Sequence, residues 1–410
     1  MRKLLALALG LQCLFASTAY ALKPVAPPSL PAPAPQMLMQ VISSDNNTSR
    51  TVTWQNTPSS ATPYLELRAE QQLLPRLFLP TATALTTPQG LRTIYTVTLT
   101  ELAAGSNYHY RVGSYPALSA WHDLRTPNSQ QLTALIFPDS QSVNYEVWAK
   151  TAAQAARANP QTDFFLNLGD LVDNGERSHE WSGWYQGAEP LVTQTPIAPV
   201  CGNHETYSDQ HTFMEPYLYL AYFPVPANGP VGLERHAYTF VQNNARFFVL
   251  NAQVGELAAY HPDLWVRQLA WLKTALAHST ETWKIVLLHR SPLGMTTTKP
   301  LNKLGQGLVP LLDQYEVDLL FAGHSHAYGR TAPLVGGQRA AQGTVYFVTG
   351  RSGDKVRRKN HARPQEDFFL NPVNEPNYLT LKIQGNTATV QAFHQSGVQF
   401  DQVTLTKKLP

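Results

Sequence analysis

The chain has 410 residues, of which 43% are hydrophobic and 14% are charged, so it is long enough for two domains with sizeable cores. This composition excludes a disordered or fibrous chain. The net charge of +3 at pH 7 is too small to predict nucleic acid or an anionic membrane surface as a partner.

The first 21 residues have the pattern of a secretory signal peptide. Arg2-Lys3 precedes an apolar run from Leu4 to Phe15, and Ala19-Tyr20-Ala21 supplies a small-x-small cleavage site. The apolar run is too short to cross a bilayer, so we expect no membrane span after cleavage. The sequence therefore predicts a secreted or periplasmic protein.

A linker and an all-β domain are predicted next. Residues 22–36 are rich in proline and alanine, which favours a semi-rigid tether. Residues 37–127 contain short segments that alternate apolar and polar side chains, such as Thr51–Trp54 and Tyr95–Leu99, and these predict a small β-sandwich. The pattern Leu-x-x-Gly-x-x-Tyr-x-Tyr-x-Val from Leu102 to Val112 resembles fibronectin type III domains. We expect this domain to act as a spacer.

The pattern changes over residues 128–410, where continuous apolar runs alternate with helical segments. Val147–Ala158 is rich in alanine and predicts a helix. A second helix is predicted by apolar side chains on one face, namely Trp265, Leu269, Leu272 and Leu276. Apolar runs between helices indicate strands buried on both faces. This region is therefore predicted to be an α/β fold of mixed β-sheets flanked by helices, with the small sandwich in front.

Five of the apolar runs end at side chains that can bind a metal ion. In α/β sheets, functional groups gather beyond the carboxyl ends of the strands. The candidate ligands at these ends are Asp139, Asp170, Asn203, His289, His324 and His326. Carboxylate, amide and imidazole donors without a thiolate suit Zn, Mn or Fe. Each residue alone is weak evidence, but five runs that end alike predict one metal centre.

The motifs around these residues, in this order, resemble the calcineurin-like metallophosphoesterase superfamily. The motifs are Asp139, Gly169–Asp173, Gly202–Glu205, His289 and Gly323–His326. With a sandwich in front, the chain is most similar to the purple acid phosphatases, which share a Gly-His-x-His-x-Tyr-x-Arg block with Gly323–Arg330. The resemblance extends from about Leu132 to the C-terminus.

The resemblance implies a centre of two divalent or mixed-valence metal ions that hydrolyses a small phosphate ester, most simply a monoester. Asp170 would bridge the two ions, and His204 would lie near the leaving group as a second catalytic residue. The other five ligands would be divided between the ions: Asp139 and His326 at the first, and Asn203, His289 and His324 at the second.

Two positions depart from the family pattern. Gln141 stands where the superfamily usually has a histidine, so it is either a weaker ligand or a neighbour of the ligands. Asp173 stands where purple acid phosphatases have a metal-binding tyrosine. It is a candidate to orient a ligand, or simply begins a turn at Asn174-Gly175. Without the tyrosinate we expect a colourless protein.

The substrate is less well defined by the sequence. Tyr328, Arg330 and Arg351 are candidates for contacts with phosphate oxygens, while Met295–Lys299 stands where the phosphatases have substrate-binding histidines. A phosphodiesterase with the same centre and a non-catalytic metal-binding scaffold are alternatives. A serine hydrolase is a more distant one, because Gly323–Ala327 ends in alanine where the nucleophile elbow has glycine. The sequence predicts neither the identity of the metal nor the oligomeric state.

Overall fold

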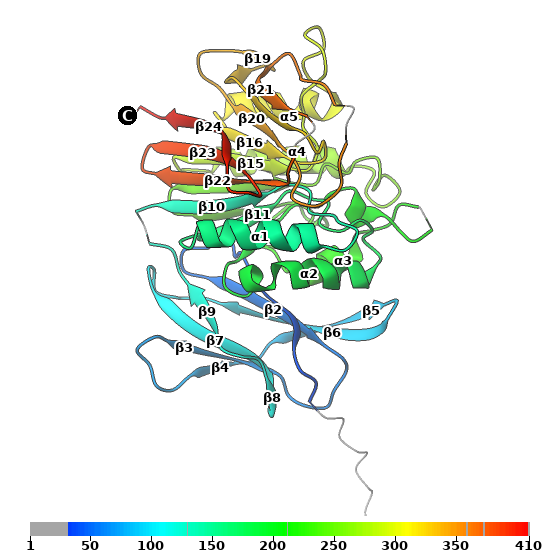
Figure 1. Ribbon diagram of the computed structural model, residues 1–410, viewed down its shortest axis with the longest axis vertical. Helices are drawn as coiled ribbons and strands as arrows, with labels where there is room; N and C mark the ends of the chain where they lie inside the picture. The colour runs from blue at the N-terminus through cyan, green and yellow to red at the C-terminus, as the bar shows by residue number, and fades with distance from the viewer. Residues whose placement is uncertain (1–31, 129, 211, 358–359, 372–373, 409–410) are drawn as a thin grey trace, which may run out of the picture.

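The computed structural model describes residues 32–128, 130–210, 212–357, 360–371 and 374–408 (Figure 1). The predicted signal peptide and most of the predicted linker lie outside these residues. An all-β region occupies one end of the molecule, and a layered α/β region occupies the other (Figure 1). No helix in the described part of the chain is both long and apolar enough to cross a membrane.

Two groups of antiparallel strands form the all-β region. The first contains β1 (Gln36–Val41), β2 (Arg50–Asn56), β5 (Thr81–Thr87) and β6 (Gly90–Leu99). The second contains β3 (Tyr64–Ala69), β4 (Arg76–Phe78), β7 (Asn107–Ser114), β8 (Ala117–Leu118) and β9 (His122–Arg125). Side chains from both groups share one core, in which the rings of Trp54 and Tyr95 lie 5.5 Å apart. The predicted all-β fold is confirmed.

The α/β region is built around two sheets. One contains β10 (Leu132–Phe137), β11 (Phe164–Asn167), β12 (Ile197–Pro199), β22 (Asn377–Gln384), β23 (Thr387–His394) and β24 (Gln399–Thr406). The other contains β13 (Tyr238–Gln242), β14 (Ala245–Leu250), β15 (Trp283–Leu288), β16 (Leu319–Ala322), β17 (Tyr328–Thr331), β20 (Val345–Thr349) and β21 (Glu366–Leu370). A small hairpin pairs β18 (Leu334–Val335) with β19 (Gln338–Arg339).

Helices cover the outer faces of both sheets. They are α1 (Glu146–Ala158), α2 (Ser178–Val192), α3 (Tyr217–Tyr222), α4 (Leu264–Ala277) and α5 (Lys303–Gln314), with a 3₁₀ turn η1 (His204–Thr206). Alternate residues of β14 show the layering: Phe247 and Val249 join the core between the sheets, whereas Phe248 and Leu250 pack in the core with α4 and α5. The predicted layered α/β fold is confirmed, including the buried strands that face apolar layers on both sides.

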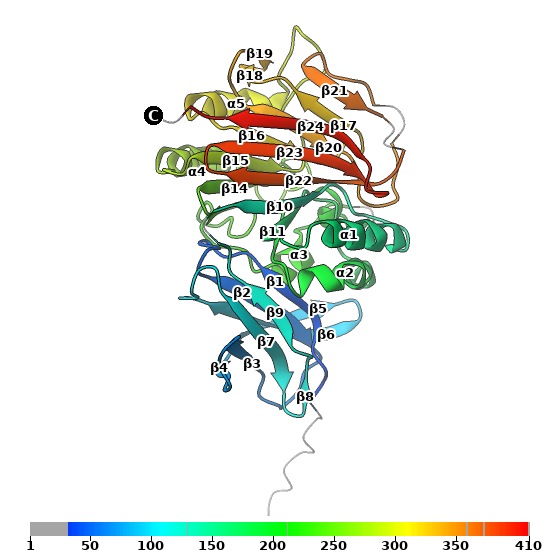
Figure 2. The ribbon, with the colours of Figure 1, turned by 60° about the vertical axis from the view of Figure 1, so that its left-hand side comes forward.

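The all-β region and the α/β region share one sheet. β1 pairs in parallel with β12 through Val41 and Ile197, so the larger sheet has ten strands, ending in β1, β2, β6 and β5 (Figure 2). The Ile42 N–H donates to the Ile197 carbonyl at 3.1 Å, and the Gln40 side chain donates to the Thr193 carbonyl at 2.9 Å. Residues far apart in the chain thus connect the two regions through backbone as well as side-chain hydrogen bonds.

The strands that precede the candidate ligands run parallel to their neighbours. β10, β11 and β12 are parallel in one sheet, and β14, β15, β16 and β20 are parallel in the other. The carboxyl ends of parallel strands lie at the same edge of a sheet. The fold therefore brings together loops from two sheets at one place.

Candidate metal centre

All six predicted metal ligands lie in the loops that follow these parallel strands. They are Asp139 after β10, Asp170 after β11, Asn203 after β12, His289 after β15, and His324 and His326 after β16. Five of the six are buried, and His324 is partly buried. The structure thus places side chains separated by up to 187 positions in one cluster.

The donor atoms of these side chains face one another at short range. His326 Nε2 lies 3.0 Å from Asp139 Oδ2. His289 Nε2 lies 3.2 Å from Asp170 Oδ2 and 3.2 Å from Asn203 Oδ1. The Asn203 amide group donates to the Tyr207 hydroxyl at 2.8 Å, which turns its oxygen toward His289.

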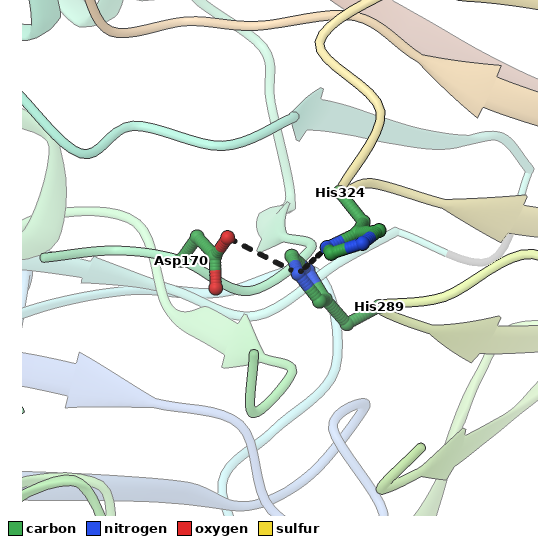
Figure 3. A group of neighbouring side chains, drawn as sticks. All are labelled: Asp170, His289 and His324. Atoms are coloured by element: carbon green, nitrogen blue, oxygen red, sulfur yellow. Dashed lines mark hydrogen bonds and ion pairs between the residues drawn. The ribbon is translucent and has the colours of Figure 1, made fainter. Parts of the chain in front are cut away.

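Five of the six residues form two groups that share one carboxylate. Asp170, His289 and His324 form the first group, with His324 Nδ1 lying 3.2 Å from His289 Nε2 (Figure 3). Asp139, Asp170 and His326 form the second group. The ligand atoms within each group lie within 4.8 Å of one another. Because Asp170 belongs to both groups, it is positioned to bridge two cations.

Hydrogen bonds to backbone carbonyls set the orientation of two imidazoles. His289 Nδ1 donates to the Leu168 carbonyl at 2.8 Å, and His326 Nδ1 donates to the Lys355 carbonyl at 2.7 Å. A carbonyl oxygen can only accept, so in the neutral ring the proton is on Nδ1 and the Nε2 lone pair faces the cluster. This is the arrangement in which histidine binds a metal ion.

Buried polar atoms without a hydrogen-bond partner test whether a cation fits the cluster. Asp139 Oδ2, Asp170 Oδ2 and Gln141 Oε1 are all buried. The imidazole nitrogens nearest the two carboxylate oxygens, His326 Nε2 at 3.0 Å and His289 Nε2 at 3.2 Å, carry no proton in the neutral ring, so the oxygens accept no hydrogen bond from the described residues in that state. Leaving a buried carboxylate oxygen without a partner is unfavourable. All three atoms lie on residues of the cluster or beside it, so a pair of metal ions fits the donors that are present.

The loops that carry the ligands adopt conformations that are uncommon for residues with side chains. Asp170, His324 and His326 have φ angles of +50°, +69° and +55°. Gly323, before His324, lies so close to Asp139 that an added Cβ would be 2.4 Å from its Oδ1 atom. Backbone strain of this kind is concentrated at functional sites, and the glycine is needed for the close approach.

Burial and neighbouring charges shift the pKa values of the ligands. Burial opposes ionisation of Asp170, but the neighbouring His289 and His204 outweigh it and lower the pKa of Asp170. Burial likewise opposes protonation of His289, yet the Asp170 carboxylate raises its pKa to about 9. Burial and then the positive charge of His289 lower the pKa of His324 to about 2. His324 therefore keeps its lone pair, whereas a proton and a cation compete for His289.

Glu205 holds two of the ligand loops together, a role that the sequence analysis missed. Its carboxylate accepts hydrogen bonds from the backbone N–H groups of Asp170 at 2.9 Å, Leu171 at 2.8 Å and Gly202 at 2.7 Å. Burial and the charge of Asp170 disfavour the ionised form of Glu205 and raise its pKa to about 8. The N–H donors favour the ionised form, but their effect is smaller. The available signal was a carboxylate placed directly after the Gly-Asn-His motif.

The predicted catalytic residue His204 lies at the edge of the cluster. Its backbone N–H donates to Asp170 Oδ1 at 3.0 Å, and its Nε2 atom lies 3.9 Å from Asp170 Oδ2. Its Nδ1 donates to the backbone carbonyl of Asp173 at 2.7 Å. In the neutral ring, Nε2 is therefore the unprotonated nitrogen beside the centre.

Asp173 and Gln141 hold different positions around the centre. Asp173 Oδ1 lies 2.9 Å from Lys355 Nζ and 3.4 Å from His204 Nδ1, so its side chain contacts the surroundings of the ligands and not the ligands themselves. Gln141 is buried, with its amide nitrogen 3.2 Å from His326 Nε2. Because the amide nitrogen and oxygen exchange places by rotation, Gln141 Oε1 is within reach of the same site.

The three candidate substrate contacts have hydrogen-bond partners within the protein. The Tyr328 hydroxyl donates to Asp401 Oδ2 at 2.7 Å, and Arg330 donates to both oxygens of Asp401, which joins β17 to β24. Arg351 is buried and donates to the Gly353 carbonyl at 2.7 Å. The polar groups of Tyr328 and Arg330 are therefore paired between two sheets, and Arg351 helps to hold its own loop. The substrate role of these three residues stays a prediction.

A second cluster of histidine and carboxylate side chains was not predicted. Its members are Glu215, His236 and His261, and we call it the Glu215 cluster. Glu215 Oε1 lies 2.7 Å from His236 Nε2 and 3.2 Å from His261 Nε2. The Gln253 N–H donates to Asn251 Oδ1, which turns the Asn251 amide group to donate to His236 Nδ1 at 3.2 Å. His236 thus carries its proton on Nε2 and donates it to Glu215.

Comparison with known proteins agrees with the architecture. Residues 130–328 match the family model for calcineurin-like phosphoesterases, and residues 35–126 match the model for the purple acid phosphatase N-terminal domain. Purple acid phosphatase 15 of Arabidopsis thaliana is 26% identical over 299 residues, which cover 64% of this chain and 54% of that protein. The chain spans about half the length, or less, of the curated relatives that it matches.

Two solved structures share the fold. The purple acid phosphatase PPD1 from yellow lupin superposes with a TM-score of 0.76 at 18% identity, over 91% of this chain and 74% of that chain. A structure of PhoD superposes with a TM-score of 0.64 at 14% identity, over 92% and 93% of the two chains. The fibronectin type III resemblance of the all-β region stays a prediction. Residues 130–328 are thus similar to the calcineurin-like phosphoesterases, and the region ahead of them is similar to the purple acid phosphatase N-terminal domain.

Proposed function

We propose that the protein is an exported, metal-dependent phosphoric ester hydrolase that acts on a small phosphate monoester. The observation that carries the proposal is the sharing of Asp170 between two groups of metal-binding side chains. A shared carboxylate is the feature that allows two cations to act on one phosphate group. The match of residues 130–328 to the calcineurin-like phosphoesterases and the buried carboxylate oxygens of Asp139 and Asp170 support the same function.

The chain's own residues would divide the work of hydrolysis. When bound, the pair of cations would supply Lewis-acid activation of a water molecule and of the phosphoryl oxygens. Asp170 would hold the two sites at a fixed separation, and its Oδ1 atom would hold the backbone of His204 in place. His204 Nε2, once protonated, would donate to the leaving oxygen, with its ring oriented by the carbonyl of Asp173.

Metal content and an ester panel test this function. We expect protein purified without added metal to carry Zn, Mn or Fe, to hydrolyse aryl phosphate monoesters, and to lose this activity in a chelator. Preferred hydrolysis of a diester would assign a phosphodiesterase, and bound metal without turnover would assign a metal-binding scaffold. Since Asp173 replaces the tyrosine of purple acid phosphatases, the loaded protein is expected to lack a strong visible absorption band.

Export is a separate part of the proposal and rests on residues 1–21. We expect the full chain, when expressed in a bacterial host, to accumulate outside the cytoplasm with Leu22 as its first residue. N-terminal sequencing of the fractionated protein measures this directly. A cytoplasmic protein that keeps Met1 would contradict export without affecting the proposed chemistry.

A further inference from the structure

Lys355 connects the two sides of the metal centre. Its backbone carbonyl accepts the hydrogen bond from His326 Nδ1 at 2.7 Å. Its ammonium group lies 2.9 Å from Asp173 Oδ1, and the same oxygen lies 3.4 Å from His204 Nδ1. The residue therefore reaches from a metal ligand on one side to the predicted proton donor on the other.

Lys355 and Asp173 are more exposed to solvent than the metal ligands are. The side chains of Asp170 and His289 are 0% exposed, and that of His326 is 2% exposed. The side chain of Lys355 is 35% exposed and that of Asp173 is 33% exposed. Solvent therefore reaches Lys355 and Asp173 beside His204, as it must reach any group that receives a substrate.

We propose that Lys355 is a substrate-binding residue, whose ammonium group contacts the non-bridging oxygens of the phosphate group, and that Asp173 is the positioning residue that directs it. This inference rests on the proposed phosphoesterase function. It explains why an acidic side chain lies beside a site that must receive an anion: Asp173 faces Lys355 and His204, both of which can be positively charged. A lysine binds phosphate as a flexible point charge.

A purely structural role for Lys355 makes different predictions. If the Lys355–Asp173 ion pair only fastened two loops, removal of the ammonium group would loosen His326 and reduce metal content. It would not affect phosphate binding once metal was restored. The His326 hydrogen bond uses the backbone carbonyl of Lys355, which substitution retains, so the two roles can be separated.

The test is calorimetric titration of the metal-loaded full-length protein with inorganic phosphate. We expect Lys355→Met to weaken phosphate binding about 10- to 100-fold, the range for a lost charge-assisted hydrogen bond, while metal content stays unchanged. Lys355→Arg keeps the charge and the pairing with Asp173 and is expected to restore most of the affinity. Lys407→Met is a matched control, because Lys407 is similarly exposed at 31% and pairs with Asp318.

Two outcomes would overturn the assignment: phosphate affinity of Lys355→Met within about twofold of the parent, or loss of metal from Lys355→Met with normal affinity after reloading. Phosphate binding does not require turnover. A protein that hydrolyses no ester but binds phosphate through Lys355 would therefore refute the proposed function and leave this inference standing.

Discussion

The metal centre and the Glu215 cluster use the same kinds of side chain, yet their hydrogen bonds differ. At the centre, His289 and His326 donate Nδ1–H to backbone carbonyls, which leaves Nε2 free to bind a cation. In the Glu215 cluster, the Asn251 amide donates to His236 Nδ1, which leaves the proton on Nε2. The partner of the remote ring nitrogen therefore determines whether an imidazole faces its neighbours as a ligand or as a donor.

The carboxylate oxygens of the metal centre and of the Glu215 cluster also differ in their hydrogen bonds. At the metal centre, the buried atoms Asp139 Oδ2 and Asp170 Oδ2 face the Nε2 atoms of His326 and His289, which carry no proton in the neutral ring and so donate no hydrogen bond. In the Glu215 cluster, both carboxylate oxygens receive imidazole nitrogens, and these hydrogen bonds outweigh burial to lower the pKa of Glu215. Histidine and carboxylate thus lie close together in both clusters, but among these described residues the carboxylate oxygens receive N–H donors at Glu215 and lone pairs at the metal centre.

The largest expected difference between the clusters is in catalysis. Asp170→Asn removes the shared negative charge between the two groups, so we expect turnover to fall by roughly 1,000-fold or more, the equivalent of several kcal/mol of metal-ion catalysis. Glu215→Gln is the matched control and is expected to retain turnover. Steady-state kinetics with an aryl phosphate measure both. Near-normal turnover in Asp170→Asn would end the two-metal mechanism.

A substitution beside the Glu215 cluster is expected to convert it into a metal site. Asn251→Asp replaces the amide donor by an oxygen, so His236 Nδ1 would hold the proton and Nε2 would face Glu215 and His261 as a ligand. We expect zinc binding at this cluster to strengthen about 10- to 100-fold, the range seen for partners that orient ligands. Zinc titration of the two proteins measures it. A third equivalent of zinc in the parent protein would contradict the comparison.

A smaller effect is expected at Gln141. Its buried Oε1 atom accepts no hydrogen bond from the residues that the structure describes, and its amide nitrogen lies 3.2 Å from His326 Nε2. Gln141 is therefore either a metal ligand or a close neighbour of one. We expect Gln141→Ala to lower the metal affinity of the group formed by Asp139, Asp170 and His326 by about tenfold. Competition with a chelator measures the change. Unchanged affinity would show that the amide group takes no part in holding the ion.

The smallest expected effect is on stability. Glu215→Gln should lower the free energy of unfolding by about 1 kcal/mol at pH 7 by weakening the partly buried hydrogen bonds to His236 and His261. The folded pKa of Glu215 lies below its usual 4.5. Its carboxylate therefore stabilises the fold above pH 4.5, and the contribution is lost as pH falls through the folded value. Urea unfolding at pH 7 and pH 4 measures this, and a difference that grew at pH 4 would contradict it.

The sequence was sufficient to predict the layers and the loops that carry the ligands. Apolar runs such as Ile285–Leu288 and Leu319–Ala322 are strands buried on both faces, and local periodicity reports that directly. It could not predict the pairing of Val41 with Ile197, because parallel pairing between distant segments leaves no local pattern. The shared sheet therefore emerges only in three dimensions.

The sequence likewise predicted only part of the candidate site. Residue type and position after a strand predicted Asp139 and His289 as candidates, and the structure brings them into one cluster. The sequence could not predict the partner of the Tyr328 hydroxyl, because Asp401 lies 73 residues away and in another sheet. Lys355 and the Glu215 cluster were missed because loop residues acquire their neighbours from tertiary packing, to which periodicity is blind.

The pairing of β1 with β12 has a consequence for any attempt to divide the molecule. β12 leads directly into the loop of Asn203, and without β1 it would present an unprotected edge whose open N–H and C=O groups invite association between chains. A truncated protein that begins after residue 127 would therefore lose more than an attached module. It would be expected to aggregate, and the strand that delivers one of the ligands would be the first part affected.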